Sequence, residues 1–173
     1  MIAPRTKLLW VLVGAVVSTM DAYPCSIEGG ISNLKLVNDA DMIVRATAVE
    51  YASPPSDTRF RTTGVPDSTI QFKVIERIRG TVTTDVILPG YLVARDDFND
   101  QQPPYTFVRP SGRAGSCFAN SYRSGGQFLL FLKKNERGQL TVNWYALAPV
   151  NEQLHSDDDP WLIWVRKLAR KEP

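Results

Sequence analysis

A chain of 173 residues is long enough for one domain of ordinary size together with a processing segment. With 43% hydrophobic and 22% charged residues, the composition argues against global disorder, and the near balance of 20 basic and 18 acidic residues excludes a nucleic-acid binder that relies on phosphate neutralisation. Two cysteines and one histidine are too few for a four-cysteine zinc site or a histidine-rich metal site.

Residues 1–22 have the pattern of a secretory signal peptide. Arg5 and Lys7 precede an apolar run at residues 8–17 (LLWVLVGAVV), and Ala22 offers a small residue for cleavage. The run is shorter than the roughly 20 residues that cross a bilayer. We therefore expect cleavage after Ala22 and a mature chain that is secreted, extracellular or periplasmic. An uncleaved N-terminal anchor is the alternative.

The mature chain, residues 23–173, is predicted to form a single domain that carries one disulfide. Exported chains fold in an oxidising space, so the two cysteines, Cys25 and Cys117, are expected to pair. Closing this long loop contributes about 4–5 kcal/mol on the chain-entropy model. Two free thiols or an intermolecular pair are the alternatives.

The first half of the mature chain shows short apolar periods separated by turn residues. In chain order, the pattern predicts a short helix over residues 31–37 and strands over residues 42–49, 70–78 and 82–88. Residues 51–68 contain three prolines and a glycine and are predicted to be a loop. The alternation of the second strand breaks at Val74 and Ile75, which indicates a bulge of the kind that bends a strand around a barrel.

The second half begins with a stretch that has no periodic pattern. Residues 89–126 contain Pro103, Pro104 and Pro110 together with five glycines, which predicts a long irregular connection that is functional or mobile. Strands are expected over residues 128–132 and 140–144, with a polar turn between them at residues 133–138. Asp159 suits a helix N-cap and Pro160 suits the first helical position, so a C-terminal helix is predicted over residues 159–170.

These elements predict a mainly β protein. Five short strands, with a long connection before the last two, favour a five-stranded barrel of the OB type over a sandwich, which normally needs about seven strands. A short helix and the C-terminal helix are expected to flank the barrel.

Five stretches of the chain, taken in order, carry a family resemblance. They are residues 39–49 (DADMIVRATAV), 70–74 (IQFKV) with Gly80 after them, 116–118 with 122–124, 128–130 with 138–140, and 148–151 (APVN). Together they resemble the tissue inhibitors of metalloproteinases, and the broader netrin-like (NTR) domain superfamily fits equally well. The resemblance covers roughly residues 25–154. It implies a secreted OB-type domain.

The resemblance also implies a mechanism. In that family the first mature residue is a cysteine whose α-amine and carbonyl chelate the catalytic zinc of the protease, at the position that water otherwise fills. Cys25 matches this cysteine, Cys117 matches its disulfide partner, and Ser26 would follow Cys25 into the protease cleft. Cleavage after Ala22 would leave Tyr23-Pro24 in front of Cys25, so that its amine is no longer free. The chain also lacks the family's further cysteines.

Other polar features of the sequence are weaker indications of a site. His155 lies beside the acidic residues 157–159, which form either a divalent-cation site or a solvated approach to a capped helix, and the capped helix is the preferred interpretation. Ser116 has no visible base in the sequence, so a catalytic triad is not predicted. One face of an OB barrel is a further place where an oligosaccharide could bind.

The C-terminal helix carries two groups of residues that each allow two interpretations. Trp161 and Trp164 form either a ligand platform or helix-packing side chains, and packing is the preferred interpretation. The basic residues among 166–171 suit either an anionic surface or a solvated helix end.

The sequence therefore predicts a non-catalytic module that binds a protein partner and has no cofactor or metal of its own. The alternative is a genuine metalloendopeptidase inhibitor in which an N-terminal Cys25 chelates the zinc of a partner metalloprotease. No nucleic-acid partner is expected, and neither is stable membrane insertion after signal cleavage.

Overall fold

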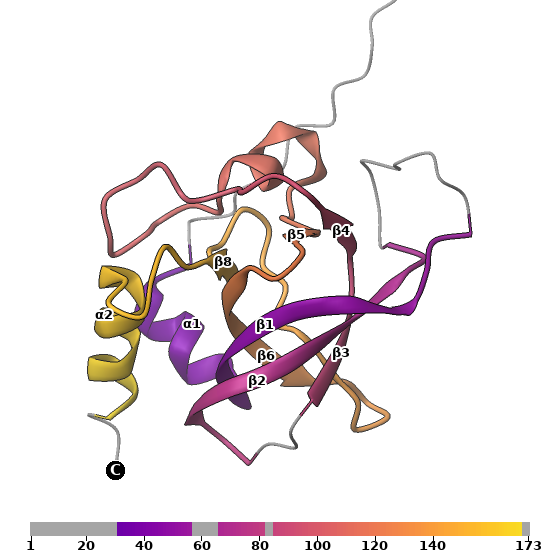
Figure 1. Ribbon diagram of the computed structural model, residues 1–173. Coiled ribbons are helices and arrows are strands. Elements are labelled where there is room, and N and C mark those ends of the chain that lie inside the picture. Colours follow the sequence, from indigo (N-terminus) through magenta and orange to yellow (C-terminus); the bar gives the residue numbers. More distant parts are fainter. Residues whose placement is uncertain (1–30, 57–65, 82–84, 171–173) are drawn as a thin grey trace, which may run out of the picture.

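The computed structural model describes residues 31–56, 66–81 and 85–170, and these are mainly β, as predicted (Figure 1). In chain order the elements are α1 (Asn33–Asp39), β1 (Met42–Ser53), β2 (Thr69–Arg79), β3 (Asp85–Pro89), β4 (Tyr91–Val93), the π-helical turn η1 (Gly112–Ser116), β5 (Ser121–Arg123), β6 (Gln127–Lys134), β7 (Leu140–Val142), β8 (Asn151–Gln153) and α2 (Pro160–Ala169). None of the helices within these ranges has the length and apolar character needed to cross a membrane.

The main sheet is antiparallel and has the strand order β3-β2-β1-β6-β7, with β8 also paired to β6. The two end strands, β3 and β7, contact one another, so the sheet curls back on itself (Figure 1). No ladder joins these two strands in the part of the chain described. The arrangement is consistent with the predicted five-stranded barrel.

The predicted bulge in the second strand is confirmed. Across the β1–β2 pair, Arg45 lies opposite Glu76 while Ala46 lies opposite Val74, so Ile75 is the additional residue. A bulge increases the local twist and bend of a strand, and this allows a long hairpin to follow the curvature of the sheet.

β6 is buried on both of its faces, which explains its continuous apolar sequence. On one face, the ring of Phe128 meets those of Phe72 and Tyr122 edge-on, at centroid distances of 6.2 and 5.1 Å. On the other face, the ring of Phe131 contacts Trp161 of α2 at 6.3 Å. The core therefore has two parts, one inside the curled sheet and one beneath the C-terminal helix.

The start of α2 is the one predicted. Asp159 is the N-cap, its carboxylate accepts a hydrogen bond from the backbone N–H of Trp161 at 2.8 Å, and Pro160 is the first helical residue. The prediction of an irregular connection over residues 89–126 is partly wrong, because this stretch contains the parallel pair β4–β5 and the turn η1. Strands of three residues are too short to show alternation. β8 was missed for the same reason.

Two glycines with positive φ, Gly80 and Gly138, allow a comparison of how much a side chain at each turn would destabilise the protein. Gly80 has φ of 82°, and a Cβ there would lie 2.4 Å from the carbonyl oxygen of Asp41, whereas Gly138 has φ of 73° with no atom within 4 Å of such a Cβ. Gly138→Ala is expected to cost about 1–2 kcal/mol from backbone strain alone. Gly80→Ala is expected to cost more, because the clash is with backbone. Equal urea midpoints for the two variants would contradict this.

Candidate functional site

Both residues of the predicted protease-binding site, Cys25 and Ser26, lie outside the described residues, and so does the predicted signal segment 1–22. The pairing of Cys25 with Cys117 therefore stays a prediction. Cys117 directly follows η1 with φ of 62°, and its carbonyl accepts a hydrogen bond from the N–H of Leu147 at 2.8 Å.

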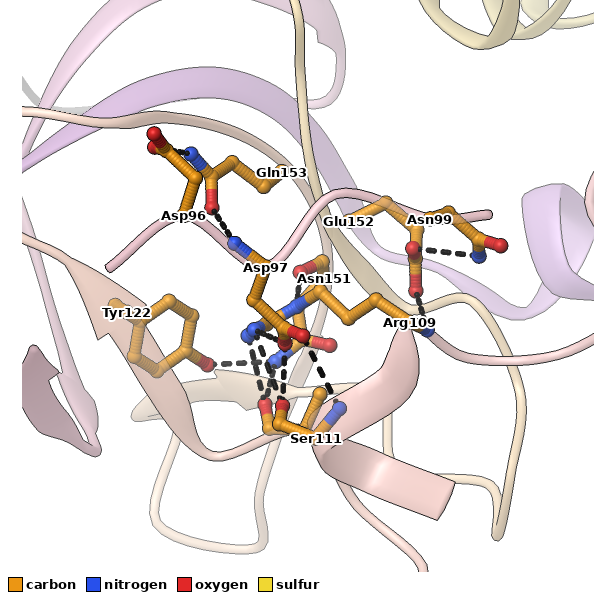
Figure 2. Close-up of polar contacts among 10 residues, drawn as sticks. Asp96, Asp97, Asn99, Arg109, Ser111, Tyr122, Asn151, Glu152 and Gln153 are labelled. Atoms are coloured by element: carbon orange, nitrogen blue, oxygen red, sulfur yellow. Dashed lines mark hydrogen bonds and ion pairs between the residues drawn. The ribbon is translucent and has the colours of Figure 1, made fainter. Parts of the chain in front are cut away.

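A buried polar cluster joins residues 94–120, here called the connecting segment, to β8 (Figure 2). Arg109 is fully buried at its centre. Its Nε donates to the carbonyl of Asn151 and its Nη2 to the carbonyl of Ala119, both at 3.1 Å. Its Nη1 donates to Oδ2 of Asp97 at 2.5 Å. One side chain thus connects three separate parts of the chain.

Aromatic rings complete the surroundings of the Arg109 guanidinium. The guanidinium carbon lies 5.4 Å from the ring centroids of both Tyr122 and Phe128. The Tyr122 hydroxyl accepts a hydrogen bond from Nδ2 of Asn151 at 2.8 Å. Burial raises the pKa of Tyr122, so its phenol stays neutral at physiological pH.

Asp97 ties the start of the connecting segment to its middle and to the barrel. Its carboxylate accepts from the N–H of Ser111 at 3.1 Å and from the Ser111 hydroxyl at 2.5 Å, in addition to Arg109. Its own N–H donates to Oε1 of Gln153 at 2.8 Å, and Nε2 of Gln153 donates to Asp96 at 2.6 Å. Because Gln153 belongs to β8, these bonds fix the segment against the sheet.

Glu152 is the second buried carboxyl group of the cluster. It accepts hydrogen bonds from the backbone N–H of Arg109 at 3.0 Å and from Nδ2 of Asn99 at 2.8 Å. The same Nδ2 donates to the carbonyl of Phe107, also at 2.8 Å. Burial raises the pKa of Glu152 to about 7, while the charge of Arg109 and these hydrogen bonds oppose the rise. Glu152 therefore changes its charge near neutral pH.

The hydrogen bonds of the cluster hold the connecting segment in one conformation. The guanidinium of Arg109 and the carboxylates of Asp97 and Glu152 are all hydrogen-bonded to other groups of the protein. Buried ion pairs of this kind contribute little net stability relative to apolar packing, but removing one partner is costly, and this fixes the geometry. Among the residues that the structure describes, no group of three or more histidine, cysteine, aspartate or glutamate residues is placed to hold a metal ion.

The outward side of the connecting segment is exposed. A shallow pocket of about 520 Å³ lies between β4 and the segment, with Arg95 and Ser111 among its lining residues. Phe107 has 38% of its surface exposed, which is unusual for a large apolar residue on a fixed segment. Arg113 pairs with Asp100 on the same segment. This side of the segment exposes both apolar and charged groups.

The acidic residues 157–159 lead into a capped helix, which is the interpretation that the sequence favoured over a cation site. The carboxylate of Asp159 is fully buried and accepts a hydrogen bond from the backbone N–H of His155 at 2.9 Å. Nδ1 of His155 lies 3.1 Å from the same oxygen. Asp157 instead pairs with Arg45 at 2.8 Å. The carboxylates of Asp157 and Asp159 thus have separate partners.

The two tryptophans are packing residues, as preferred from the sequence. Trp161 is fully buried and its ring lies 5.3 Å from that of Tyr105 and 6.3 Å from that of Phe131. The half-buried ring of Trp164 stacks on Trp161 at 5.3 Å. Together they attach α2 to the barrel and to the connecting segment.

The basic end of α2 is partly neutralised. Nε of Arg166 donates to Glu76 at 2.9 Å, and this hydrogen bond lowers the pKa of Glu76. Lys167 and Arg170 are exposed, as expected of a solvated helix end. The side chain of Ser116 lies outside what the structure describes.

Sequence reasoning missed the Arg109 cluster because its signal is weak. Arg109 lies between Val108 and Pro110 in a stretch without periodicity, and residues 151–153 (NEQ) have the composition of an exposed turn. In the structure these three residues form β8, and all of them are buried. A buried polar side chain is recognised by its partners, and here the partners are distant in sequence.

No known protein-family model matches the chain, and no curated protein matches it. The resemblance to the tissue inhibitors of metalloproteinases therefore rests on the five stretches of sequence given above. Function has to be inferred from the fold and from the geometry of the connecting segment.

Proposed function

We propose that the protein is an exported, non-catalytic protein-binding module whose partner contacts the exposed side of the connecting segment. The observation that carries this proposal is the Arg109 cluster. It holds a long irregular segment in a defined conformation on a β scaffold, and long irregular connections in compact domains are usually functional.

A segment that is held in place before association reduces the entropic cost of binding. A binding surface made of loose loop residues loses about 0.5–1.5 kcal/mol for each side chain that it immobilises on association. Where the segment is already held by Asp97, Arg109 and Glu152, much of that cost falls on folding instead of binding. A preformed surface of this kind suits the recognition of a protein partner.

Charge and export are consistent with this proposal. The formal net charge of +2 gives no support for a nucleic-acid partner. The signal-like residues 1–22 support a partner that lies outside the cytoplasm, in the extracellular space or the periplasm. The module needs no cofactor or metal of its own to act by binding.

A genuine metalloendopeptidase inhibitor is the second candidate, and the position of Cys117 favours it. Cys117 directly follows η1 and belongs to the connecting segment. A disulfide to Cys25 would therefore hold the mature N-terminus next to the proposed binding surface. The resemblance then implies that Cys25 chelates the partner's zinc, with Ser26 behind it. An intact mass that begins at Cys25 with one disulfide would support inhibition. A mass that begins at Tyr23 would rule out chelation by a free Cys25 amine.

Site-specific photocrosslinking in producing cells tests the binding proposal. A benzoylphenylalanine at Phe107 or at Arg113 is expected to give a discrete adduct with one other protein, because both residues are exposed on the connecting segment. Ile87 on β3 is 57% exposed and provides the matched control, which should give no such adduct. Equal adducts at all three positions, or none at the first two, would contradict the proposal.

A further inference from the structure

The connecting segment passes near the start of α2 (Figure 1). The two parts of the chain line a second pocket there. This pocket has a volume of about 280 Å³. Its walls include Asn99, Asp100 and Tyr105 from the segment, and His155 and Pro160 from the approach to the helix. It is smaller than the roughly 300–1,000 Å³ of typical small-molecule sites, so a single long side chain fits it better than a larger ligand.

Two contacts fix the ring of His155 at this pocket. The ring stacks on Phe98, with a centroid distance of 4.2 Å and an angle of 16° between the planes. Nδ1 lies 3.1 Å from a buried carboxylate oxygen of Asp159. Because a carboxylate accepts hydrogen bonds, the tautomer of the neutral ring that fits this contact has its proton on Nδ1, and Nε2 is then an acceptor. The His155 side chain is 51% exposed and lines the pocket.

The charges around the pocket are mostly negative. Asp100 lines it, and among the described residues no lysine or arginine does so. Asp159 and Glu152 lie close to Tyr105, whose pKa is raised to about 12 by burial and then by these two carboxylates. Arg113 pairs with Asp100, yet a carboxylate offers about four acceptor positions and can bond a second donor.

The nearby helix N-terminus does not offset this negative field. Pro160 has no N–H group, and the N–H of Trp161 is occupied by the Asp159 carboxylate. The N–H of Ile163 donates to the backbone carbonyl of Asp159 at 3.0 Å. The N–H groups of Trp161 and Ile163 are therefore not available to an anion.

We propose that this pocket binds an arginine side chain of the partner protein. The guanidinium lies between Asp100 and Nε2 of His155, and the aliphatic stem lies against Tyr105, Pro103 and Pro160. Arginine suits the site because its planar fork supplies five donors to a set of acceptors, and its stem covers apolar surface. This inference rests on the proposed function, because the arginine belongs to the bound protein.

An NMR titration with a small probe tests the pocket without the partner. N-acetylarginine amide is expected to shift the resonances of His155, Asn99 and Asp100 in a saturable manner, with a dissociation constant on the order of 1–10 mM. N-acetylcitrulline amide has nearly the same shape but no charge, and it should produce no saturable shift. Asp100→Asn should weaken binding of the arginine probe about tenfold, the effect of one charge-assisted hydrogen bond.

Glu136→Gln is the matched control, because Glu136 is an exposed carboxylate on the distant turn between β6 and β7. It should leave the affinity for the probe unchanged. Equal binding of the two probes, the absence of saturation, or shifts confined to another surface would overturn the inference. Crosslinking at Phe107 without probe binding would overturn this inference alone, whereas probe binding without adducts at Phe107 or Arg113 would overturn the proposed function.

Discussion

Arg109→Met is expected to lower the free energy of unfolding by about 3–5 kcal/mol, the usual cost of removing one partner from a buried ion pair. The substitution leaves Asp97 without its cation and removes the donors to the carbonyls of Ala119 and Asn151. Methionine fills a similar volume without a charge, so the loss reports on the polar bonds more than on packing. Urea denaturation followed by circular dichroism measures the effect.

Arg113→Met is the matched control for this experiment. Arg113 also pairs with an aspartate of the connecting segment, Asp100, but the side chain of Asp100 is 60% exposed and that of Arg113 is 34% exposed, whereas that of Arg109 is fully buried. Exposed pairs contribute about 0–1 kcal/mol, so this variant should unfold close to the wild-type midpoint. A loss below 1 kcal/mol for Arg109→Met, or equal losses for the two variants, would contradict the structural role given to Arg109.

The second large effect is a dependence of stability on pH that originates at Glu152. Its pKa is about 7 in the folded protein against 4.5 in the unfolded chain, and burial is the main cause. The stabilisation associated with the protonated form is fully present below pH 4.5 and is lost as pH rises through 7. The loss is on the order of 3 kcal/mol between these limits. Urea denaturation at pH 5 and at pH 8 measures it.

Glu152→Gln separates this effect from other titrations. Glutamine is neutral at both pH values, so the variant should lose most of the difference between pH 5 and pH 8, even though its amide cannot accept the bond from Asn99 as well as a carboxylate does. Asp39 and Glu76 have lowered pKa values and act with the opposite sign, at more acidic pH. Equal wild-type stability at pH 5 and pH 8 would show that Glu152 does not titrate as described.

The parts of the fold with a regular local pattern could be predicted from the sequence. The alternation of residues 42–49 and 70–74 and the apolar run of residues 128–132 correspond to β1, β2 and β6. Asp159 and Pro160 identify the start of α2, because the cap and the first helical turn depend on neighbouring residues only. Local chemistry determines these elements, so a local interpretation succeeds.

The connecting segment could not be predicted in this way. Arg109 is bonded to Asn151, which lies 42 positions away, and Glu152 is bonded to Asn99 across 53 positions. No periodic pattern encodes such pairs, and polar residues 151–153 suggest an exposed turn when they are considered alone. Their burial follows from the curvature of the sheet and the position of the segment, and both are properties of the folded chain.

Backbone amide hydrogen exchange, followed by NMR, tests most directly whether the connecting segment is held in one conformation before it binds. The N–H groups of Val108, Arg109 and Ser111 donate to Leu147, Glu152 and Asp97, so their protection should lie within about tenfold of that of the Phe131 N–H in β6. Exchange of these three amides at the rate of an unstructured peptide, while Phe131 stays protected, would contradict a preformed binding surface.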